Sequence, residues 1–168
     1  MKIGKTTFIL SAALSFFILT GLPPAIAADG MVAGTIAIEM EDGHVEPGNW
    51  IRILLVTSAV EVPTMDRAMP PGDPDYVDTV NSLHTGFYIQ VQNHLAEKGY
   101  LFATTLTTDE GTFKIPAVAP GVYFVVVKFP DNIRGHKVAW QVPVKIESGK
   151  TATVNLNRSN LALPTVKR

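Results

Sequence analysis

The sequence lacks cysteine altogether. Of its 168 residues none is Cys, so the chain can form no disulfide, thiolate metal site, iron–sulfur cluster or c-type haem attachment. Charge is also sparse, since Asp, Glu, Lys and Arg together make up 17% of the chain. An exported domain of this composition has to be held together by its hydrophobic core alone.

The chain also lacks any excess of basic residues. Its formal net charge is −1, and the predicted leader described below holds two lysines and no acidic residue, so the remainder is slightly more acidic still. Nucleic-acid binding depends on a basic face that neutralises phosphates. We therefore expect no nucleic-acid partner.

Catalytic motifs are missing as well. The serines have no G-x-S-x-G context, and the chain contains neither a phosphate-binding loop nor a dinucleotide-binding glycine fingerprint. We therefore predict that the protein is not an enzyme and that it holds no cofactor.

Residues 1–27 have the pattern of a secretory signal peptide. Lys2 and Lys5 precede an apolar run over residues 8–19, and Ala25-Ile26-Ala27 fits the small-x-small cleavage site. The run is short for a membrane span, which needs about 20 apolar residues. We predict cleavage after Ala27, a periplasmic or extracellular location, and no transmembrane span after cleavage.

The clearest structural pattern lies in residues 107–129. Asp109 and Gly111 stand between two runs rich in Thr, Phe and Ile, which is typical of a tight hairpin turn. Pro120-Gly121 predicts a second turn. The run from Val122 to Phe129 has only Lys128 as a polar residue, which indicates a central strand covered on both faces.

Alternating apolar residues predict further strands along the chain. They cover residues 34–40, 50–58, 100–107, 112–115, 137–144 and 152–156, and Pro143 indicates either an edge position for its strand or a break in it. With 122–129 this makes seven short strands. The fold class is therefore predicted as mainly β: an antiparallel, seven-strand, Greek-key-type sandwich over residues 28–156, with one helical insertion between strands. Residues 157–168 are expected to form a tail on the surface or a partly disordered one.

The helical insertion is predicted at about residues 63–99. Asp73-Pro74 resembles an N-cap followed by proline, and Lys98-Gly99 is typical of a helix end. Apolar residues recur at helical spacing at Val80, Leu83, Phe87, Val91 and Leu95. Because the strand at 50–58 is apolar on both faces, we expect this helix to cover one face of its sheet.

The turn and strand residues resemble a known family. Thr108-Asp109-x-Gly111-x-Phe113-x-Ile115 followed by Pro120-Gly121-x-Tyr123 is similar to the signature of carboxypeptidase regulatory-like domains, which are transthyretin-like β-sandwiches. Gly34-Thr35-Ile36 and Gly149-Lys150-Thr151 also fit that pattern. The resemblance covers roughly residues 34–156 except 63–99. It implies a non-catalytic accessory or binding module and a corner role for Tyr123, with the ring buried and the hydroxyl bonded to nearby backbone.

The insertion departs from the family and is where we look for function. A candidate partner surface is formed by the polar aromatic residues in and just after it, namely Tyr76, His84, Tyr88, His94 and Tyr100. In the alternative interpretation the aromatic residues of this region, Phe87 and Phe102 above all, only pack the helix on the sheet.

Two groups of side chains resemble metal sites, and neither is favoured. His94 and Glu97 share a helix face and could ligate zinc with His44 or His136, but such short motifs arise by chance. The carboxylates near the first turn match no defined calcium loop, and they are Asp29, Glu39, Glu41, Asp42 and Glu46.

The functional hypothesis is a non-enzymatic exported binding or assembly module that contacts another exported protein or an envelope component. The alternative is a carbohydrate-binding module. An autonomous zinc hydrolase is the least favoured of the three hypotheses, because the chain is too short for a carboxypeptidase catalytic domain.

Overall fold

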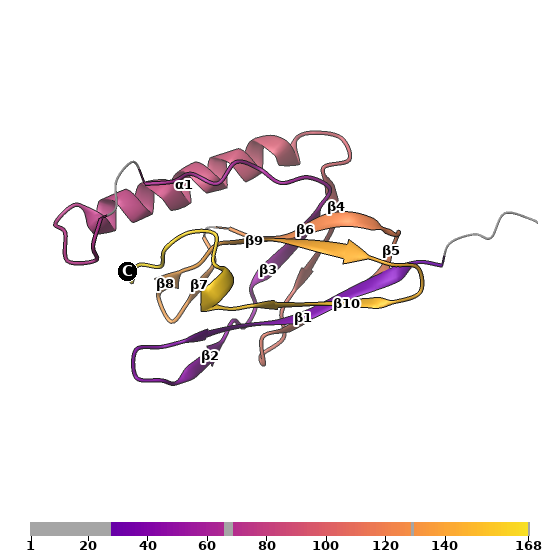
Figure 1. Ribbon diagram of the computed structural model, residues 1–168, viewed down its shortest axis with the longest axis horizontal. Coiled ribbons are helices and arrows are strands. Elements are labelled where there is room, and N and C mark those ends of the chain that lie inside the picture. The colour runs from indigo at the N-terminus through magenta and orange to yellow at the C-terminus, as the bar shows by residue number, and fades with distance from the viewer. Residues whose placement is uncertain (1–27, 66–68, 129, 168) are drawn as a thin grey trace, which may run out of the picture.

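The structure, a computed structural model, describes residues 28–65, 69–128 and 130–167. The predicted signal peptide, residues 1–27, lies outside the described residues. The strands form two main sheets, and one long helix lies along the outer side of them (Figure 1).

The first sheet is organised around β1, which pairs with three other strands. Its members are β1 (Gly30–Glu39), β2 (Val45–Pro47), β5 (Thr112–Val118) and β10 (Thr151–Leu156). The N-terminal part of β1 lies between β5 and β10, and its C-terminal part pairs with β2.

The second sheet is antiparallel throughout and has the order β4-β3-β6-β9. Its strands are β3 (Arg52–Val56), β4 (Leu101–Leu106), β6 (Gly121–Val127) and β9 (Trp140–Ile146). A small hairpin of β7 (Asn132–Ile133) and β8 (His136–Lys137) connects β6 to β9. The edge position of β9 confirms the prediction made from Pro143.

The predicted fold class, a mainly β sandwich with a helical insertion, is confirmed. Among the described residues the seven strands of five or more residues are β1, β3, β4, β5, β6, β9 and β10. One pairing departs from the expected antiparallel pattern, because β1 and β10 run parallel, with Met31 opposite Thr151 and Ile36 opposite Leu156. Side chains alternate with a period of two in both arrangements, so the sequence pattern does not distinguish them.

The apolar residues form two cores on opposite faces of the second sheet. Ile53 and Leu55 of β3 point into the sandwich core, whereas Leu54 and Val56 point to a second core under the helix. Both sets are buried, which confirms the prediction that this strand is covered on two sides. β6 divides in the same way, with Val125 in the sandwich core and Val126 under the helix.

The helix α1 (Tyr76–Leu95) directs Leu83, Phe87 and Val91 into the second core, and Val80 on the same helix is also buried. Its ends differ from the prediction. The N-cap is Asp75, whose backbone N–H is bound by the Asp73 carboxylate at 2.9 Å, and the C-cap is Ala96. Asp73 therefore stabilises the turn before the helix and does not cap it. Gly99, with φ +85°, belongs to the turn that follows.

The segment before α1 runs back along the helix (Figure 1). It passes so close to Gly86 that a Cβ there would lie 3.3 Å from Cγ of Pro63. A glycine in mid-helix costs about 1 kcal/mol relative to alanine. Here it leaves room for Pro63, which explains a residue that the helical pattern alone does not.

Residues 157–167 of the C-terminal tail are partly buried, which corrects the expectation that the tail lies on the surface. After the short 3-10 helix η1 (Arg158–Asn160), Ala162 N donates to the carbonyl oxygen of Ala139 at 2.9 Å. Leu163 is 3% exposed and packs in the core under α1. The tail thus completes the layer formed by the helix.

Smaller differences concern element ends and single side chains. β1 begins at Gly30 instead of residue 34, and β2 was not among the predicted strands. Lys137, which begins the strand predicted at 137–144, is buried, and its Nζ donates to Asn81 Oδ1 at 2.6 Å. Trp50 lies outside β3 and is 63% exposed, with φ +56°. A long side chain can be buried when its amine finds a partner, which a strand pattern cannot reveal.

Tyr123 is buried beside Gly121, and its ring meets Phe102 edge to face at 5.1 Å. The predicted hydroxyl bond to the backbone is not made within the described residues, so the ring packing alone defines this corner.

None of the helices in the described part of the chain is long and apolar enough to cross a membrane.

Candidate functional site

The five residues predicted as a partner surface do not form one surface. His84 is 1% exposed and Tyr100 is 3% exposed. Both residues are buried in the interior, so their prediction as part of a partner surface is wrong. His84 faces the core because it falls on the same helical stripe as Leu83 and Phe87. Tyr76, Tyr88 and His94 are half-buried at different places along α1.

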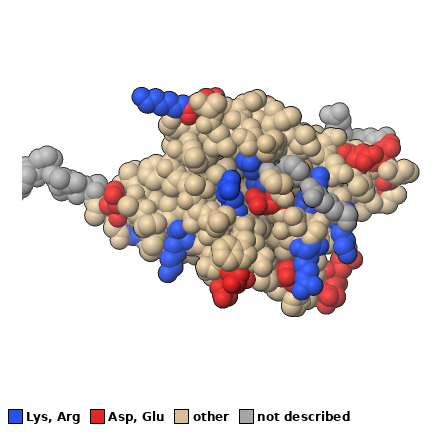
Figure 2. Space-filling model, turned by 180° about the vertical axis from the view of Figure 1, so that it is seen from behind, with Lys and Arg blue, Asp and Glu red and all other residues tan. Residues whose placement is uncertain are grey.

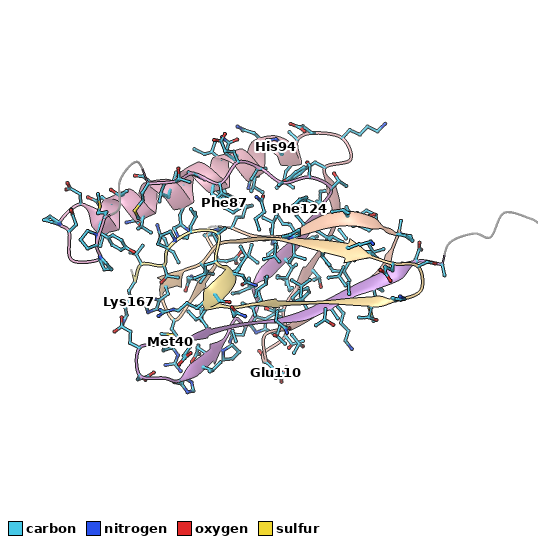
Figure 3. The ribbon with its side chains drawn as sticks, in the orientation of Figure 1. Met40, Phe87, His94, Glu110, Phe124 and Lys167 are labelled. Carbon is cyan, nitrogen blue, oxygen red and sulfur yellow. The ribbon has the colours of Figure 1, made fainter. Side chains whose placement is uncertain are left out.

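The half-buried residues of α1 make local contacts. His94 donates through Nδ1 to the Gln90 carbonyl oxygen at 2.9 Å, and its ring lies 5.3 Å from that of Tyr100, near the C-terminal end of α1 (Figure 3). The ring of Tyr88 lies 4.6 Å below the Lys128 ammonium. The ring contacts of His94 with Tyr100 and of Tyr88 with Lys128 join the helix to the residues beside it.

No group of three or more metal-ligating side chains comes together among the described residues. His94 Nε2 lies 4.0 Å from Glu97 Oε1 without a third ligand. Of the carboxylates near the first turn, Glu46 is bound to Arg134 Nε at 2.9 Å, and this bond holds the pKa of Glu46 below its usual value. The geometry therefore gives no support to a zinc or calcium site in the described chain.

The first surface with functional features is the open side of β4, called the β4 edge below. β4 pairs with β3 on one side only, and no described strand pairs with its other side. Alternate backbone N–H and C=O groups of an edge strand point to that open side. β4 reads LFATTL and contains neither charge nor proline, and Leu101, Phe102 and Leu106 are between 39% and 48% exposed.

Other edges of the two sheets are protected in ways that β4 is not. β2 has three residues and ends in Pro47, and β9 carries Pro143 and Lys145. On β10 the exposed side chains are polar, since Thr151, Thr153 and Asn155 point outward. Natural sheets use proline, charge and short strands to prevent unwanted strand pairing. The β4 edge lacks these devices.

A shallow groove of about 440 Å³ lies beside the β4 edge. Leu95 of α1, Leu54 of β3 and Leu101 of β4 contribute apolar walls, and Arg52 contributes the charged one. Seen from behind, uncharged residues cover much of the surface, and charged side chains lie near its middle as well as at its margins (Figure 2). The apolar walls of this groove lie next to the exposed apolar side chains of β4, and exposed apolar surface is typical of protein–protein contacts.

Arg52 belongs to a charged group on the helix side of the second sheet. Burial lowers the pKa of Lys128, and Asp131 opposes that shift. Burial raises the pKa of Asp131, while a hydrogen bond from the backbone N–H of Arg52 and the nearby positive charges oppose it. The group thus holds two basic side chains and one acidic one, and Asp131 offsets part of the positive charge.

The second surface is a cleft of about 640 Å³ at the end of the sandwich, called the end cleft below. Its charged and ring side chains are Glu41, Asp42, Tyr76, His136, Arg158 and Lys167. Met40 and Lys167 mark this end of the molecule, opposite to His94 (Figure 3). Of the five predicted site residues, only Tyr76 lines this cleft.

Sequence reasoning missed both surfaces. The strand at 100–107 was predicted, and its lack of charge was visible, but its edge position depends on which strands become its neighbours. The end cleft unites the turn after β1, the first turn of α1, β8 and the tail. Residues so far apart in the sequence give no local signal.

Comparison with known families gives a match that covers only part of the chain. The family model described as polysaccharide lyase family 4, domain II, matches residues 75–154, somewhat less than half of the chain. The match supports a β-sandwich and is not to carboxypeptidase regulatory-like domains, so that narrower label stays a prediction. No curated protein is similar enough in sequence to count as a match.

Two solved structures are distantly similar. A candidate carbohydrate-binding protein from Pseudomonas aeruginosa is 12% identical over 79% of this chain and 90% of its own, with a TM-score of 0.47. A minor pilin from Streptococcus agalactiae is 16% identical over 84% of this chain and 48% of its own, with a TM-score of 0.45. Similarity at this level does not inform the function.

Proposed function

We propose that the protein is an exported, non-enzymatic binding module that contacts another exported protein through the β4 edge. The observation that carries the proposal is the combination on β4 of an unpaired side, three exposed apolar residues and no charge. An extended segment of a partner can add to such an edge as a further strand, with backbone hydrogen bonds supplying affinity. The adjacent groove would receive an apolar side chain of that segment.

A crosslinking experiment tests this proposal. A photoreactive residue at Phe102 should crosslink the protein to an envelope or secreted partner, and Thr104→Lys or Leu106→Lys should abolish the product because a lysine on an edge opposes strand addition. Thr153→Lys, on the edge strand β10 of the other sheet, is the matched control and should leave the product unchanged. Equal melting temperatures of the three variants would show that they fold alike.

The proposal fails if no crosslinked product forms in the native compartment, or if Thr153→Lys removes the product as completely as Thr104→Lys. A product with twice the mass of the chain would identify the partner as a second copy.

Export is part of the same proposal, and it is supported by the charged start, the apolar run and the Ala25-Ile26-Ala27 site of the leader. Mass spectrometry of the protein from the producing cells should give a mature chain that begins at Ala28. A chain that retains residues 1–27 would contradict it.

Carbohydrate binding is a second candidate function. It is favoured by the matched family model, which is described as a domain of a polysaccharide lyase family. Retardation of the protein in polysaccharide affinity gels tests this candidate without assuming where on the surface the sugar binds.

A further inference from the structure

The end cleft has the volume of a small-molecule site. Its approximately 640 Å³ fall within the range of about 300–1,000 Å³ that ligand pockets occupy. The residues around it come from the turn at 40–42, the first turn of α1, β8, η1 and residues 165–167. It is therefore a feature of the tertiary fold, separate from the β4 edge.

The walls of the cleft are held in place by hydrogen bonds that do not depend on a ligand. In the turn after β1, Met40 N donates to the His44 carbonyl oxygen at 2.8 Å, and His44 N donates to Asp42 Oδ1 at 3.0 Å. In the tail, Lys137 N donates to the Val166 carbonyl oxygen at 3.0 Å. Walls fixed in advance lower the entropy cost of binding.

Arg158 is also positioned by its neighbours. It begins η1, whose cap Asn157 accepts from Ser159 N at 2.9 Å and donates through its own N–H to Asn160 Oδ1 at 2.9 Å. The carbonyl oxygen of Asn157 is bound by Nε1 of the buried Trp140 at 2.9 Å. The guanidinium therefore extends from a fixed turn.

The charges that line the cleft balance each other. Glu41 and Asp42 are acidic, Arg158 and Lys167 are basic, and among the described residues no ion pair joins these four side chains. An anion would meet the two carboxylates and a cation would meet the two basic groups. A neutral ligand that carries many hydroxyl groups can instead donate to the carboxylates and accept from the guanidinium and the amine.

The remaining lining suits a ring with one apolar face. Tyr76 is half-buried and presents an aromatic ring, and Met40 and Val166 add apolar surface beside it. Aromatic rings with a polar tip bind ligands that are apolar on one face and wet at the edge. The combination is complementary to the C–H face and the hydroxyl rim of a pyranose.

We propose that the end cleft is a binding site for a short neutral saccharide, with Tyr76 stacking on a ring and with Glu41, Asp42, Arg158 and Lys167 bonding its hydroxyls. The inference rests on the second candidate function, carbohydrate binding. It adds the place of binding, the end cleft, and the kind of ligand, a saccharide without net charge. It does not depend on the β4 edge.

The test uses the whole exported protein and isothermal titration with four tetrasaccharides. Maltotetraose, cellotetraose and galactotetraose are neutral, and tetragalacturonate is the anionic control. At least one neutral ligand should bind, and its affinity should change little between about 0.05 and 0.5 M salt because no net charge is neutralised. Tyr76→Ala and Arg158→Ala should each weaken binding by about tenfold or more.

Matched controls separate a site from a general loss of structure. Tyr88→Ala replaces a tyrosine on the same helix outside the cleft, and Lys114→Ala removes an exposed cation from β5. Both should bind like the unchanged protein. Melting temperatures of all variants are measured in parallel, and the affinity of a destabilised variant is determined below its unfolding range.

Three results would overturn the inference. They are the absence of binding by all three neutral ligands at millimolar concentration, binding of tetragalacturonate alone with strong salt dependence, and neutral binding that survives both Tyr76→Ala and Arg158→Ala. The last result would leave carbohydrate binding as a function and remove only its location. Thr104→Lys on the β4 edge should not alter saccharide binding, so the two proposals fail independently.

Discussion

The imidazole of His84 donates a hydrogen bond from Nε2 to the carbonyl oxygen of Pro164 at 2.9 Å. This bond joins the middle of α1 to the C-terminal tail, and His84 is 1% exposed. The other ring nitrogen, Nδ1, is buried and has no hydrogen-bond partner among the described residues. The neutral ring is thus hydrogen-bonded through Nε2 and buried at Nδ1.

Stability should fall in mild acid because of His84. Burial lowers its pKa, the bond to Pro164 opposes that effect, and the nearby Lys137 charge adds to it. The unfolded chain therefore binds a proton more readily, and the contribution of neutral His84 is lost as pH falls through the unfolded value of about 6.5 toward the lower folded value. Urea unfolding of the unchanged protein at pH 7.5 and pH 5 should show this loss.

The matched variants for this prediction are His84→Gln and His94→Gln. His84→Gln should be less stable at pH 7.5 and should show a smaller drop between the two pH values, because the titrating ring is gone. His94→Gln should keep the full drop. An unchanged drop in His84→Gln would assign the acid sensitivity to other groups.

Gly111 is needed at the turn before β5. Its φ is +74°, and a Cβ there would overlap the carbonyl oxygen of Ile36. Gly43 has φ +80° with open space around it. Gly43→Ala should therefore lower the free energy of unfolding only by the cost of holding alanine at a positive φ, about 1–2 kcal/mol. Gly111→Ala should cost clearly more in thermal unfolding. Equal costs would show that the turn can move away from Ile36.

Thr107 joins two loops by one hydroxyl. Its Oγ1 accepts from Ile51 N at 2.8 Å and donates to the Gly48 carbonyl oxygen at 2.6 Å, in the interior. Thr107→Val keeps the volume and leaves both groups unpaired, which should cost about 1–3 kcal/mol for each. Thr107→Ser keeps the hydroxyl and should retain most of the stability in urea unfolding. A Val variant as stable as the Ser variant would contradict the role of the hydroxyl.

Phe87 should carry the attachment of α1 to the sheet. It is fully buried in the core under the helix, whereas Ile89 on the same helix is 50% exposed. Phe87→Ala should cost about 3–5 kcal/mol of unfolding free energy, as expected for a large residue lost from a packed core. Ile89→Ala should stay within about 0.5 kcal/mol. Similar small effects of both would mean that the helix contributes little to the stability of the domain.

The sequence by itself determined the local elements. The turn at Asp109 and Gly111, the alternation of the strands and the stripe from Val80 to Val91 each involve residues close in the chain, so their periods reveal them. The apolar run at 50–58 also predicted that both faces of its strand are buried. In the structure the opposing sheet covers one face and α1 covers the other. Helix ends and strand ends were less accurate, because competing local turns such as that of Asp73 shift them by a few residues.

Only the tertiary structure decided where the functional surfaces lie. His84 and Tyr100 looked like surface residues in the sequence and are buried, because the tail packs against α1 and the turn at Gly99 brings Tyr100 under the helix end. The exposure of β4 and the union of Tyr76 with Arg158 in one cleft depend on strand order and on the path of the tail. These are long-range relationships, and the alternation of side chains along a strand or helix carries no information about them.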